Sequence, residues 1–205
     1  MAGERTDKGE VIGVTGFIGS GKSMVSRFLA RSLACPYLDA DKVARDLMMP
    51  GQQGWLVVKE YNRKYIMADG QLNRLLLRND IFSDHQVKDA IDSLIHPLVK
   101  GKLEELLGPK PCARAVVEVP LLFEAGWDEF FARIILVYAE KNTCLKRVME
   151  RDMVGVAQAE QSYLCQMAAT EKIKRADHVI DNGGPWWNTQ LQIVHLVDIL
   201  TGEPG

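Results

Sequence analysis

Apolar residues along the chain follow two recurring patterns. Short, nearly uninterrupted apolar runs have the length and composition of buried strands, and the longer segments between them repeat apolar residues every three or four positions, as amphipathic helices do. Because this alternation is typical of strand–helix–strand units, it predicts an α/β fold with one parallel sheet covered by helices. The five predicted strands are residues 11–14, 36–38, 115–119, 134–138 and 178–180.

The stretch from 55 to 107 has no strand pattern and is expected to form several helices. Two of them are predicted at 87–94 and 98–107, divided by His96 and Pro97. The pattern predicts one domain over residues 10–200, preceded by a disordered tail at 1–9. Its expected parts are a core at 10–54, 108–149 and 176–200, a helical substrate-binding insertion at about 55–107 and a helical lid at about 150–175.

The octapeptide GFIGSGKS, residues 16–23, lies between the first predicted strand and a helical stretch that begins near Ser23. Glycines allow backbone N–H groups to wrap around phosphate oxygens, and the following helix adds its positive N-terminal end. Lys22 is expected to reach the β/γ-phosphates and Ser23 to bind Mg²⁺. The pattern therefore predicts a nucleoside triphosphate site. The residues expected to contact the nucleotide here are Gly16, Gly19, Ser20, Gly21, Lys22 and Ser23.

The composition narrows the classes of partner. A chain of 205 residues with 47% hydrophobic residues can build a domain core without disulfides, and a formal net charge of −2 gives no general electrostatic case for nucleic acid. No charge-free run approaches the roughly 20 residues of a membrane span. The cysteines lack Cys-x-x-Cys pairs, which argues against zinc and favours reduced thiols in the cytoplasm. We expect a monomer or a weak homo-oligomer that binds neither nucleic acid nor membrane.

Two carboxylates, Asp39 and Asp41, follow the second predicted strand. Side chains two apart in an extended chain point to one side, so both are predicted to face one cleft, one accepting a hydroxyl proton and the other near Mg²⁺ through water. The alternative for either residue alone is to cap a helix that starts at Lys42.

Arg147 and Arg151 follow the fourth predicted strand and lie four apart, hence on one helix face. Arginines aimed at a cleft would stabilise the charge of a transferring phosphoryl group. The alternative is an exposed basic face paired with Glu150 and Asp152.

The segments that follow two other predicted strands give less specific evidence of function. After the third strand, Leu121 and Leu122 either line an acceptor pocket or belong to the core, and Glu124 is structural or weakly functional. After the last strand, Asn182 and Gly183 either hold adenine through main-chain groups or form a plain turn.

Together these motifs resemble the dephospho-CoA kinase family from residue 11 to about 184. The phosphate loop is shared with many enzymes, whereas the Asp-Ala-Asp, His-Pro and Val-Pro-Leu-Leu-Phe-Glu motifs at their separations are specific. The matching segments are TGFIGSGKS at 15–23, DADKVAR at 39–45, DGQL at 69–72 with Arg74 and IF at 81–82, HP at 96–97, VPLLFE at 119–124, RD at 151–152 and ADHVIDNG at 176–183.

The resemblance implies a P-loop three-layer α/β/α fold that transfers the ATP γ-phosphoryl group to the ribose 3′-hydroxyl of dephospho-CoA, giving CoA and ADP. It implies Mg²⁺ as the cofactor of ATP. Asp41 matches the catalytic base, Lys22 and Ser23 handle ATP and Mg²⁺, Arg147 and Arg151 act from the lid, and Asn182 with Gly183 hold the adenine end. The residues expected at the acceptor are Asp41, Arg74, His96, Leu121 and Leu122, although the His-Pro pair can also be a helix-ending turn.

The sequence departs from the family pattern at three positions. Phe17 replaces a second glycine and is expected at the outer edge of the loop. Ser162 stands where many members have arginine, so that a lid contact is either missing or supplied by Lys172 or Arg175. Asn73 replaces the usual aspartate beside Arg74.

Two other readings compete with this one. A kinase of the same architecture could act on a nucleoside or nucleotide, and Arg74 with Arg78 leave that acceptor open. A GTP-dependent switch lacks support, because the chain has no Asn-Lys-x-Asp guanine signature and its only Asp-x-x-Gly, from Asp181 to Gly184, follows the last predicted strand.

Overall fold

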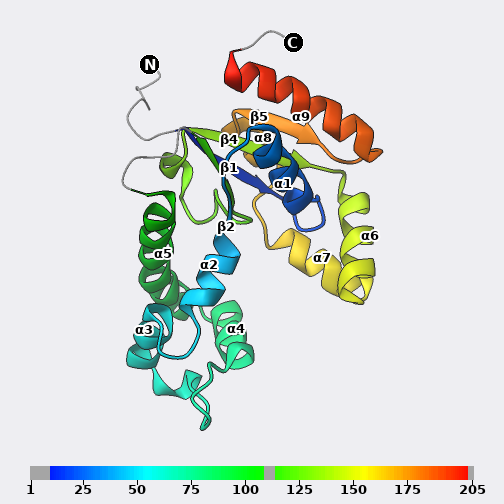
Figure 1. Ribbon diagram of the computed structural model, residues 1–205. Coiled ribbons are helices and arrows are strands. Elements are labelled where there is room, and N and C mark those ends of the chain that lie inside the picture. The colour runs from blue at the N-terminus through cyan, green and yellow to red at the C-terminus, as the bar shows by residue number, and fades with distance from the viewer. Residues whose placement is uncertain (1–9, 109–113, 203–205) are drawn as a thin grey trace. The chain divides into compact units, whose positions relative to one another are not determined.

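The computed structural model describes residues 10–108 and 114–202, so the tail predicted at 1–9 and Cys112 lie outside the described residues. Five parallel strands form one sheet in the order β2-β3-β1-β4-β5 (Figure 1). Each predicted strand is confirmed to within two residues at its ends. The strands are β1 (Glu10–Gly16), β2 (Tyr37–Asp39), β3 (Arg114–Glu118), β4 (Arg133–Tyr138) and β5 (His178–Asp181).

The register of the sheet brings the carboxyl ends of the strands to one edge. β1 is central and pairs with β3 on one side and with β4 on the other. Asp39 at the end of β2 is the register partner of Glu118 at the end of β3. On the far side, Tyr138 pairs with Asp181. In parallel α/β sheets this edge is where ligands collect.

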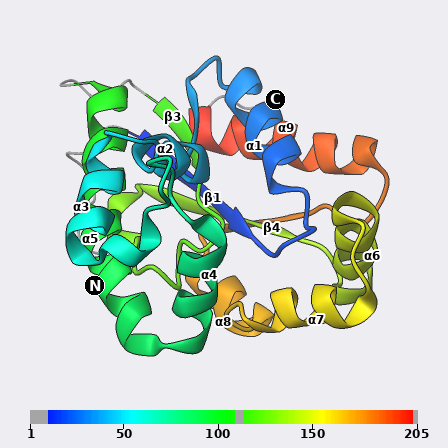
Figure 2. The same ribbon diagram turned by 90° about the horizontal axis from the view of Figure 1, so that it is seen from below.

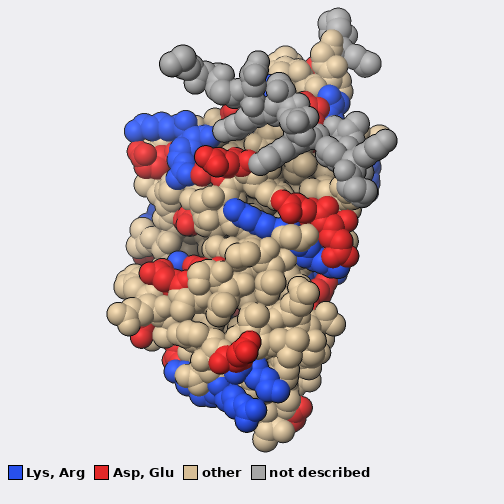
Figure 3. Space-filling view, turned by 90° about the vertical axis from the view of Figure 1, so that its left-hand side faces the viewer, with Lys and Arg blue, Asp and Glu red and all other residues tan. Residues whose placement is uncertain are grey.

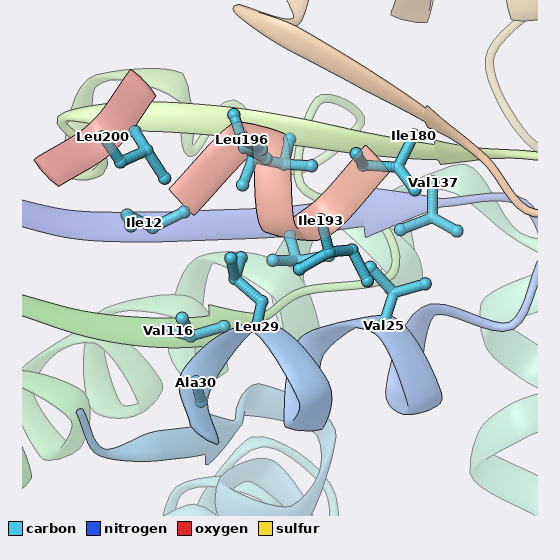
Figure 4. Close-up of a cluster of buried hydrophobic side chains, with 12 residues drawn as sticks. Ile12, Val25, Leu29, Ala30, Val116, Val137, Ile180, Ile193, Leu196 and Leu200 are labelled. Atoms are coloured by element: carbon cyan, nitrogen blue, oxygen red, sulfur yellow. The ribbon is translucent and has the colours of Figure 1, made fainter. Parts of the chain in front are cut away.

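The main core lies between the sheet and two helices, α1 (Lys22–Ser32) and α9 (Trp186–Thr201). Figure 2 shows both on one side of the strands, with α7 (Val156–Leu164) and α8 (Ala169–Arg175) on the other side. Buried residues recur at helical spacing on α1 and α9, and each fully buried Leu or Ile contributes roughly 1.5–3 kcal/mol. The cluster in Figure 4 includes Ile12, Val25, Leu29, Val116, Val137, Ile180, Ile193, Leu196 and Leu200.

Contacts divide the chain into two compact units, of which the second is Ala40–Pro109. Its helices are α2 (Ala40–Leu47), α3 (Gln53–Tyr61), α4 (Arg74–Ser83) and α5 (His85–Leu107), with a 3₁₀ turn at Arg63–Tyr65. The unit has its own apolar cluster, which includes Trp55, Val58, Tyr65, Leu77 and Ile91. The insertion expected at 55–107 falls within this unit, which also contains α2 and the start of α3. The first unit holds the sheet and the remaining helices, α1, α6 (Lys141–Asp152), α7, α8 and α9.

The prediction of two helices divided at His96-Pro97 is wrong, because α5 is continuous and Pro97 lies inside it. A proline within a helix removes one hydrogen bond and costs about 3 kcal/mol or more. Ile91 before the proline, and Val99 and Leu103 after it, are all buried. Their burial, at roughly 1.5–3 kcal/mol each, exceeds the cost of the proline.

The surface carries charges of both signs. On the face drawn in Figure 3, basic groups lie beside acidic ones over several parts of the chain. Among the described residues, no helix combines the length and the apolar character that crossing a bilayer requires.

Candidate functional site

The phosphate loop joins β1 to α1 at the carboxyl edge of the sheet. Gly19 and Gly21 have φ values of +80° and +87°, in the left-handed region that other residues rarely adopt. A Cβ on Gly19 would lie 2.3 Å from the Cys144 carbonyl oxygen, and one on Gly21 would lie 2.2 Å from Asn182 Nδ2. Both conformation and space therefore require glycine at these two positions.

The loop ends at the N-terminus of α1, which has Gly21 as its N-cap and no acidic residue in its first turn. The positive end of this 11-residue helix is thus available to an anion. Ser20 is fully buried. Its N–H donates to the Phe17 carbonyl at 3.1 Å, and its hydroxyl makes no hydrogen bond with the described residues. Ser20 therefore shapes the loop, and its predicted contact with the nucleotide stays a prediction.

The sequence predicted Phe17 at the outer edge of the loop, and this prediction is wrong. Its side chain is 1% exposed and stacks on Tyr163, with ring centroids 4.7 Å apart. The ring fills a cluster with Ala139 and Cys144, because burying a phenyl group there removes more apolar surface from water than an outward position would. Lys22 Nζ donates to the Phe17 carbonyl oxygen at 2.9 Å.

Glu118 is a site residue that the sequence analysis did not single out. Its carboxylate is buried, and it accepts hydrogen bonds from Ser23 Oγ and from the Tyr37 hydroxyl, both at 2.7 Å. Burial, together with the Glu118 carboxylate, raises the pKa of the Tyr37 phenol, so the phenol remains a donor at neutral pH. The available signal was an acidic residue directly after the apolar run at residues 115–117 of β3.

These oxygens suit Mg²⁺. The ion prefers oxygen ligands, keeps several waters and is commonly held by one or two protein groups plus substrate phosphates. Ser23 Oγ and Glu118 Oε1 lie 2.7 Å apart beside the loop. The described residues contain no group of three or more His, Cys, Asp or Glu side chains that could hold a metal ion.

Asp39 and Asp41 do not follow one another in extended chain, so the predicted extended geometry is wrong, whereas a shared cleft for the two carboxylates stays a prediction. α2 begins at Ala40, which leaves Asp39 as the last residue of β2 and places Asp41 in the first turn of the helix. A carboxylate there interacts favourably with the helix dipole. Asp41 is exposed. It lies two positions after Asp39, which is the register partner of Glu118 in the sheet.

The two arginines of α6 have different surroundings. Arg147 donates from Nη2 to the Asn182 carbonyl oxygen at 2.9 Å and lies within 3.5 Å of the Gly19 carbonyl oxygen, so it contacts the phosphate loop. Arg151 is exposed and pairs with Asp152 at 2.7 Å. Arg147 thus lies at the phosphate loop and Arg151 on an exposed face, and the predicted role of both in phosphoryl transfer stays a prediction.

Asn182 connects the end of β5 to the phosphate loop. Its side chain is buried, with Nδ2 donating to the Ser20 carbonyl oxygen at 2.8 Å and Oδ1 accepting from Thr189 Oγ1 at 2.9 Å. The N–H of Asn182 donates to the Tyr138 carbonyl, and that of Gly183 to Asp181 Oδ1. Both N–H groups are used within the protein, so an adenine contact by these residues is left to their carbonyl groups.

The segment after β3 separates into core and surface. Leu122 is 0% exposed, which corrects its predicted contact with the acceptor in favour of the core alternative, whereas Leu121 is 48% exposed. Glu124 accepts from the Met167 N–H at 2.9 Å and pairs with Lys172 Nζ at 2.8 Å, so it has a structural role.

Arg74 and His96 lie in the second unit. Arg74 is exposed at the start of α4, where Asn73 accepts a hydrogen bond from the Leu76 N–H as the N-cap. Asparagine and aspartate cap helices about equally well, which accounts for the asparagine at this position. His96 lies inside α5, so the turn alternative is wrong. Burial lowers the pKa of His96 despite Asp92 nearby.

Lys172 and Arg175, either of which could supply the lid contact if it is not missing at Ser162, both have partners within the protein. Lys172 is fully buried and pairs with Glu124. Its Nζ lies 4.9 Å from the centroid of the Phe17 ring. Arg175 pairs with Asp128. Instead, Gln166 of the same segment reaches the loop, where its Oε1 accepts the Ile18 N–H at 2.8 Å.

Comparisons with known proteins agree on one family. A family model described as dephospho-CoA kinase matches residues 10–186. A dephospho-CoA kinase of Moorella thermoacetica is 37% identical, over 95% of this chain and 97% of that protein. A dephospho-CoA kinase domain-containing protein of Danio rerio is 35% identical, over 91% of this chain and 83% of that protein.

Solved structures show the same fold. A Thermus thermophilus protein superposes with a TM-score of 0.82 at 32% identity, covering 97% of this chain and 100% of that one. A dephospho-CoA kinase from Campylobacter jejuni has a TM-score of 0.65 at 25% identity, covering 95% and 99%. A shikimate kinase from Acinetobacter baumannii, at 17% identity and a TM-score of 0.57 over 96% of this chain and 95% of that one, shares the fold.

Proposed function

This chain belongs to the dephospho-CoA kinase family, which phosphorylates the 3′-hydroxyl of dephospho-CoA with ATP, and we propose which of its residues carry that reaction. The products are CoA and ADP, and the reaction is the final step of coenzyme A biosynthesis. The observation that carries the residue assignment is the glycine-dependent phosphate loop, with Lys22 and Ser23 beside the buried Glu118 carboxylate.

On the donor side, the loop and the N-terminus of α1 bind the triphosphate of ATP. Lys22 exchanges its hydrogen bond with the Phe17 carbonyl for the β/γ-phosphates, and Arg147 holds the loop from α6. The Asn182 side chain holds the Ser20 carbonyl of the loop, and the carbonyl groups of Asn182 and Gly183 are proposed to contact adenine. Arg151 acts only when the segment 150–175 closes as a lid, because its present partner is Asp152.

For the metal, Ser23 and Glu118 are the residues that would hold Mg²⁺. When bound, the ion neutralises charge on the β- and γ-phosphate oxygens. Ser23 would contribute its hydroxyl oxygen directly, and Glu118 would accept from Ser23 or from a water of the ion. The half-buried Tyr37 hydroxyl keeps the Glu118 carboxylate oriented.

On the acceptor side, Asp41 is the proposed general base for the 3′-hydroxyl. Its carboxylate is exposed and therefore open to a substrate. Arg74, His96 and Leu121 are proposed to contact dephospho-CoA. We also propose that the enzyme works in the cytoplasm as a monomer or weak homo-oligomer, in keeping with Cys144 and Cys165 being thiols.

The activity itself is tested by ADP release from Mg-ATP with dephospho-CoA, adenosine, AMP and CMP offered in parallel. We expect turnover with dephospho-CoA alone, with CoA identified by mass as the product. Turnover confined to AMP or CMP would keep the donor site and reject dephospho-CoA as the acceptor for this chain.

Glu118→Gln should raise the Mg²⁺ concentration required for half-maximal activity by about 10- to 100-fold, the usual cost of removing a charged group that orients a metal ligand. The amide oxygen can accept from one of the two hydroxyls of Ser23 and Tyr37, and the amide NH₂ can donate to the oxygen of the other, so the fold should be kept. The measurement is initial rate against MgCl₂ at fixed ATP. An unchanged Mg²⁺ requirement would show that Glu118 only supports the fold.

A further inference from the structure

The peptide group between Phe17 and Ile18 is held at both ends. Its carbonyl oxygen accepts from Lys22 Nζ at 2.9 Å, and its N–H donates to Gln166 Oε1 at 2.8 Å. A peptide group is planar and rigid, so these two side chains fix its orientation. Gln166 therefore lies one peptide group away from the ammonium that is expected to reach the β/γ-phosphates.

Gln166 is itself held in place by the segment it belongs to. It follows the C-terminus of α7, and its N–H donates to the Tyr163 carbonyl at 3.2 Å. The Tyr163 ring stacks on Phe17, the residue that precedes Ile18. The segment from α7 thus contacts the loop through an aromatic stack and an amide.

An ion pair between the buried Lys172 and the partly exposed Glu124 supports the other side of Gln166. The next N–H along the chain, that of Met167, donates to Glu124 Oε1 at 2.9 Å, and Glu124 pairs with the fully buried Lys172. Burial raises the pKa of the Glu124 carboxyl, but the Lys172 pair and the Met167 N–H outweigh it, so the net pKa is lowered. Glu124 is therefore ionised at neutral pH and keeps this support in place.

The amide of Gln166 has a second polar atom. Its oxygen is used by Ile18, and within the described part of the chain its Nε2 has no hydrogen-bond partner. A side-chain amide carries two donors on that nitrogen. Because the amide is planar, these donors lie beside the loop N–H and at the end of the peptide group opposite to the Lys22 ammonium.

We propose that Gln166 binds the γ-phosphoryl group of ATP through Nε2 while its Oε1 holds the Ile18 N–H in place. This inference rests on the proposed nucleotide site and adds a residue to it. Gln166 would distinguish a triphosphate from a diphosphate, because ADP has no oxygen at the γ-position. It would also link the segment at 150–175 to the presence of ATP.

The test compares two substitutions. Gln166→Ala removes both polar atoms, and we expect it to weaken binding of a non-hydrolysable ATP analogue by about 10-fold or more, as for loss of a hydrogen bond to a charged group, while ADP binding changes by less than about 3-fold. Gln166→Glu keeps an acceptor for the Ile18 N–H but places a negative charge beside the γ-phosphate. We expect about a 100-fold loss for the analogue, again with a much smaller change for ADP.

Calorimetry with Mg²⁺ and each nucleotide, in the absence of any acceptor, gives the ratio of the two dissociation constants. Gln161→Ala and Gln161→Glu are matched controls, because Gln161 is an exposed glutamine on α7 that precedes Gln166 by five positions. Both controls should leave the ratio as in the wild-type protein.

Two results would overturn the proposal. One is a Gln166→Glu variant that binds the ATP analogue as tightly as the wild type. The other is an equal loss of analogue and ADP binding in Gln166→Ala, which would mark a residue that only shapes the loop. If Gln166→Ala loses its thermal transition, Gln166→Glu decides alone, since it retains the Ile18 contact. Absence of turnover with dephospho-CoA would reject the acceptor assignment without altering the nucleotide ratio.

Discussion

Replacing Asp41 with asparagine should lower kcat with dephospho-CoA by about 10²- to 10⁴-fold, the typical contribution of general-base assistance. The amide has nearly the shape of the carboxylate but cannot accept the 3′-hydroxyl proton. Asp41 is exposed in the first turn of α2, so the change removes only a favourable interaction with the helix dipole, worth about 0.3–1 kcal/mol. Steady-state kinetics and calorimetry with ATP should show lost turnover with unchanged nucleotide affinity.

Asp46→Asn is the matched control for this prediction. Asp46 lies on the same helix and is also exposed, and its ion pair with Lys42 at 2.8 Å is a surface pair of small value. We expect its kcat to stay near that of the wild-type enzyme. Near-normal turnover in Asp41→Asn would reject Asp41 as the base, and an equal fall in both variants would indicate a general effect on α2.

Lys22→Ala is expected to lower kcat by about 10²- to 10³-fold or more, because it removes a positive charge aimed at the phosphates where charge develops. In the nucleotide-free protein, Lys22 makes a half-buried hydrogen bond to the Phe17 carbonyl. Losing this hydrogen bond should lower the free energy of unfolding by about 1 kcal/mol, which corresponds to a fall of about 2–4 °C in the thermal midpoint of a chain of this size. The measurement is kcat together with thermal melting, with and without Mg-ATP.

Lys146→Ala provides the comparison for Lys22→Ala, since Lys146 is an exposed lysine on α6 of the same unit. It should retain both activity and the rise in midpoint that ATP produces. A fall in the nucleotide-free midpoint of Lys22→Ala well beyond about 4 °C would instead identify Lys22 as a residue that holds the loop together.

Features that depend on neighbouring residues could be predicted from the sequence. Each strand is a short apolar run, because both faces of a parallel strand are covered, and the α/β fold followed from the alternation of these runs with helical segments. The phosphate loop could also be recognised from the sequence, since Gly19, Gly21 and the Gly-Lys-Ser ending reflect local backbone geometry. The family resemblance rested on motifs of the same local kind.

Features that depend on contacts between distant residues were missed or wrong. Ser23 and Glu118 are 95 positions apart, and Ile18 and Gln166 are 148 positions apart. No periodicity within either segment predicts such a pairing. Phe17 was placed outside because the cluster that buries it comes from the residue after β4 and from α6, α7 and α8. Pro97 was taken as a helix end because its local cost is visible in sequence and the burial of the whole of α5 is not.

The central position of β1 also determines the order in which the chain folds. β1 is synthesised first, yet its partners are β3 and β4, and β2 likewise pairs with β3. At about 5–20 residues per second, roughly 5–20 s pass between translation of β1 and of β3. During that interval the helical unit Ala40–Pro109 is completed with a core of its own. We therefore expect the inserted unit to assemble before the sheet, with β1 unpaired for longer than any other strand during translation.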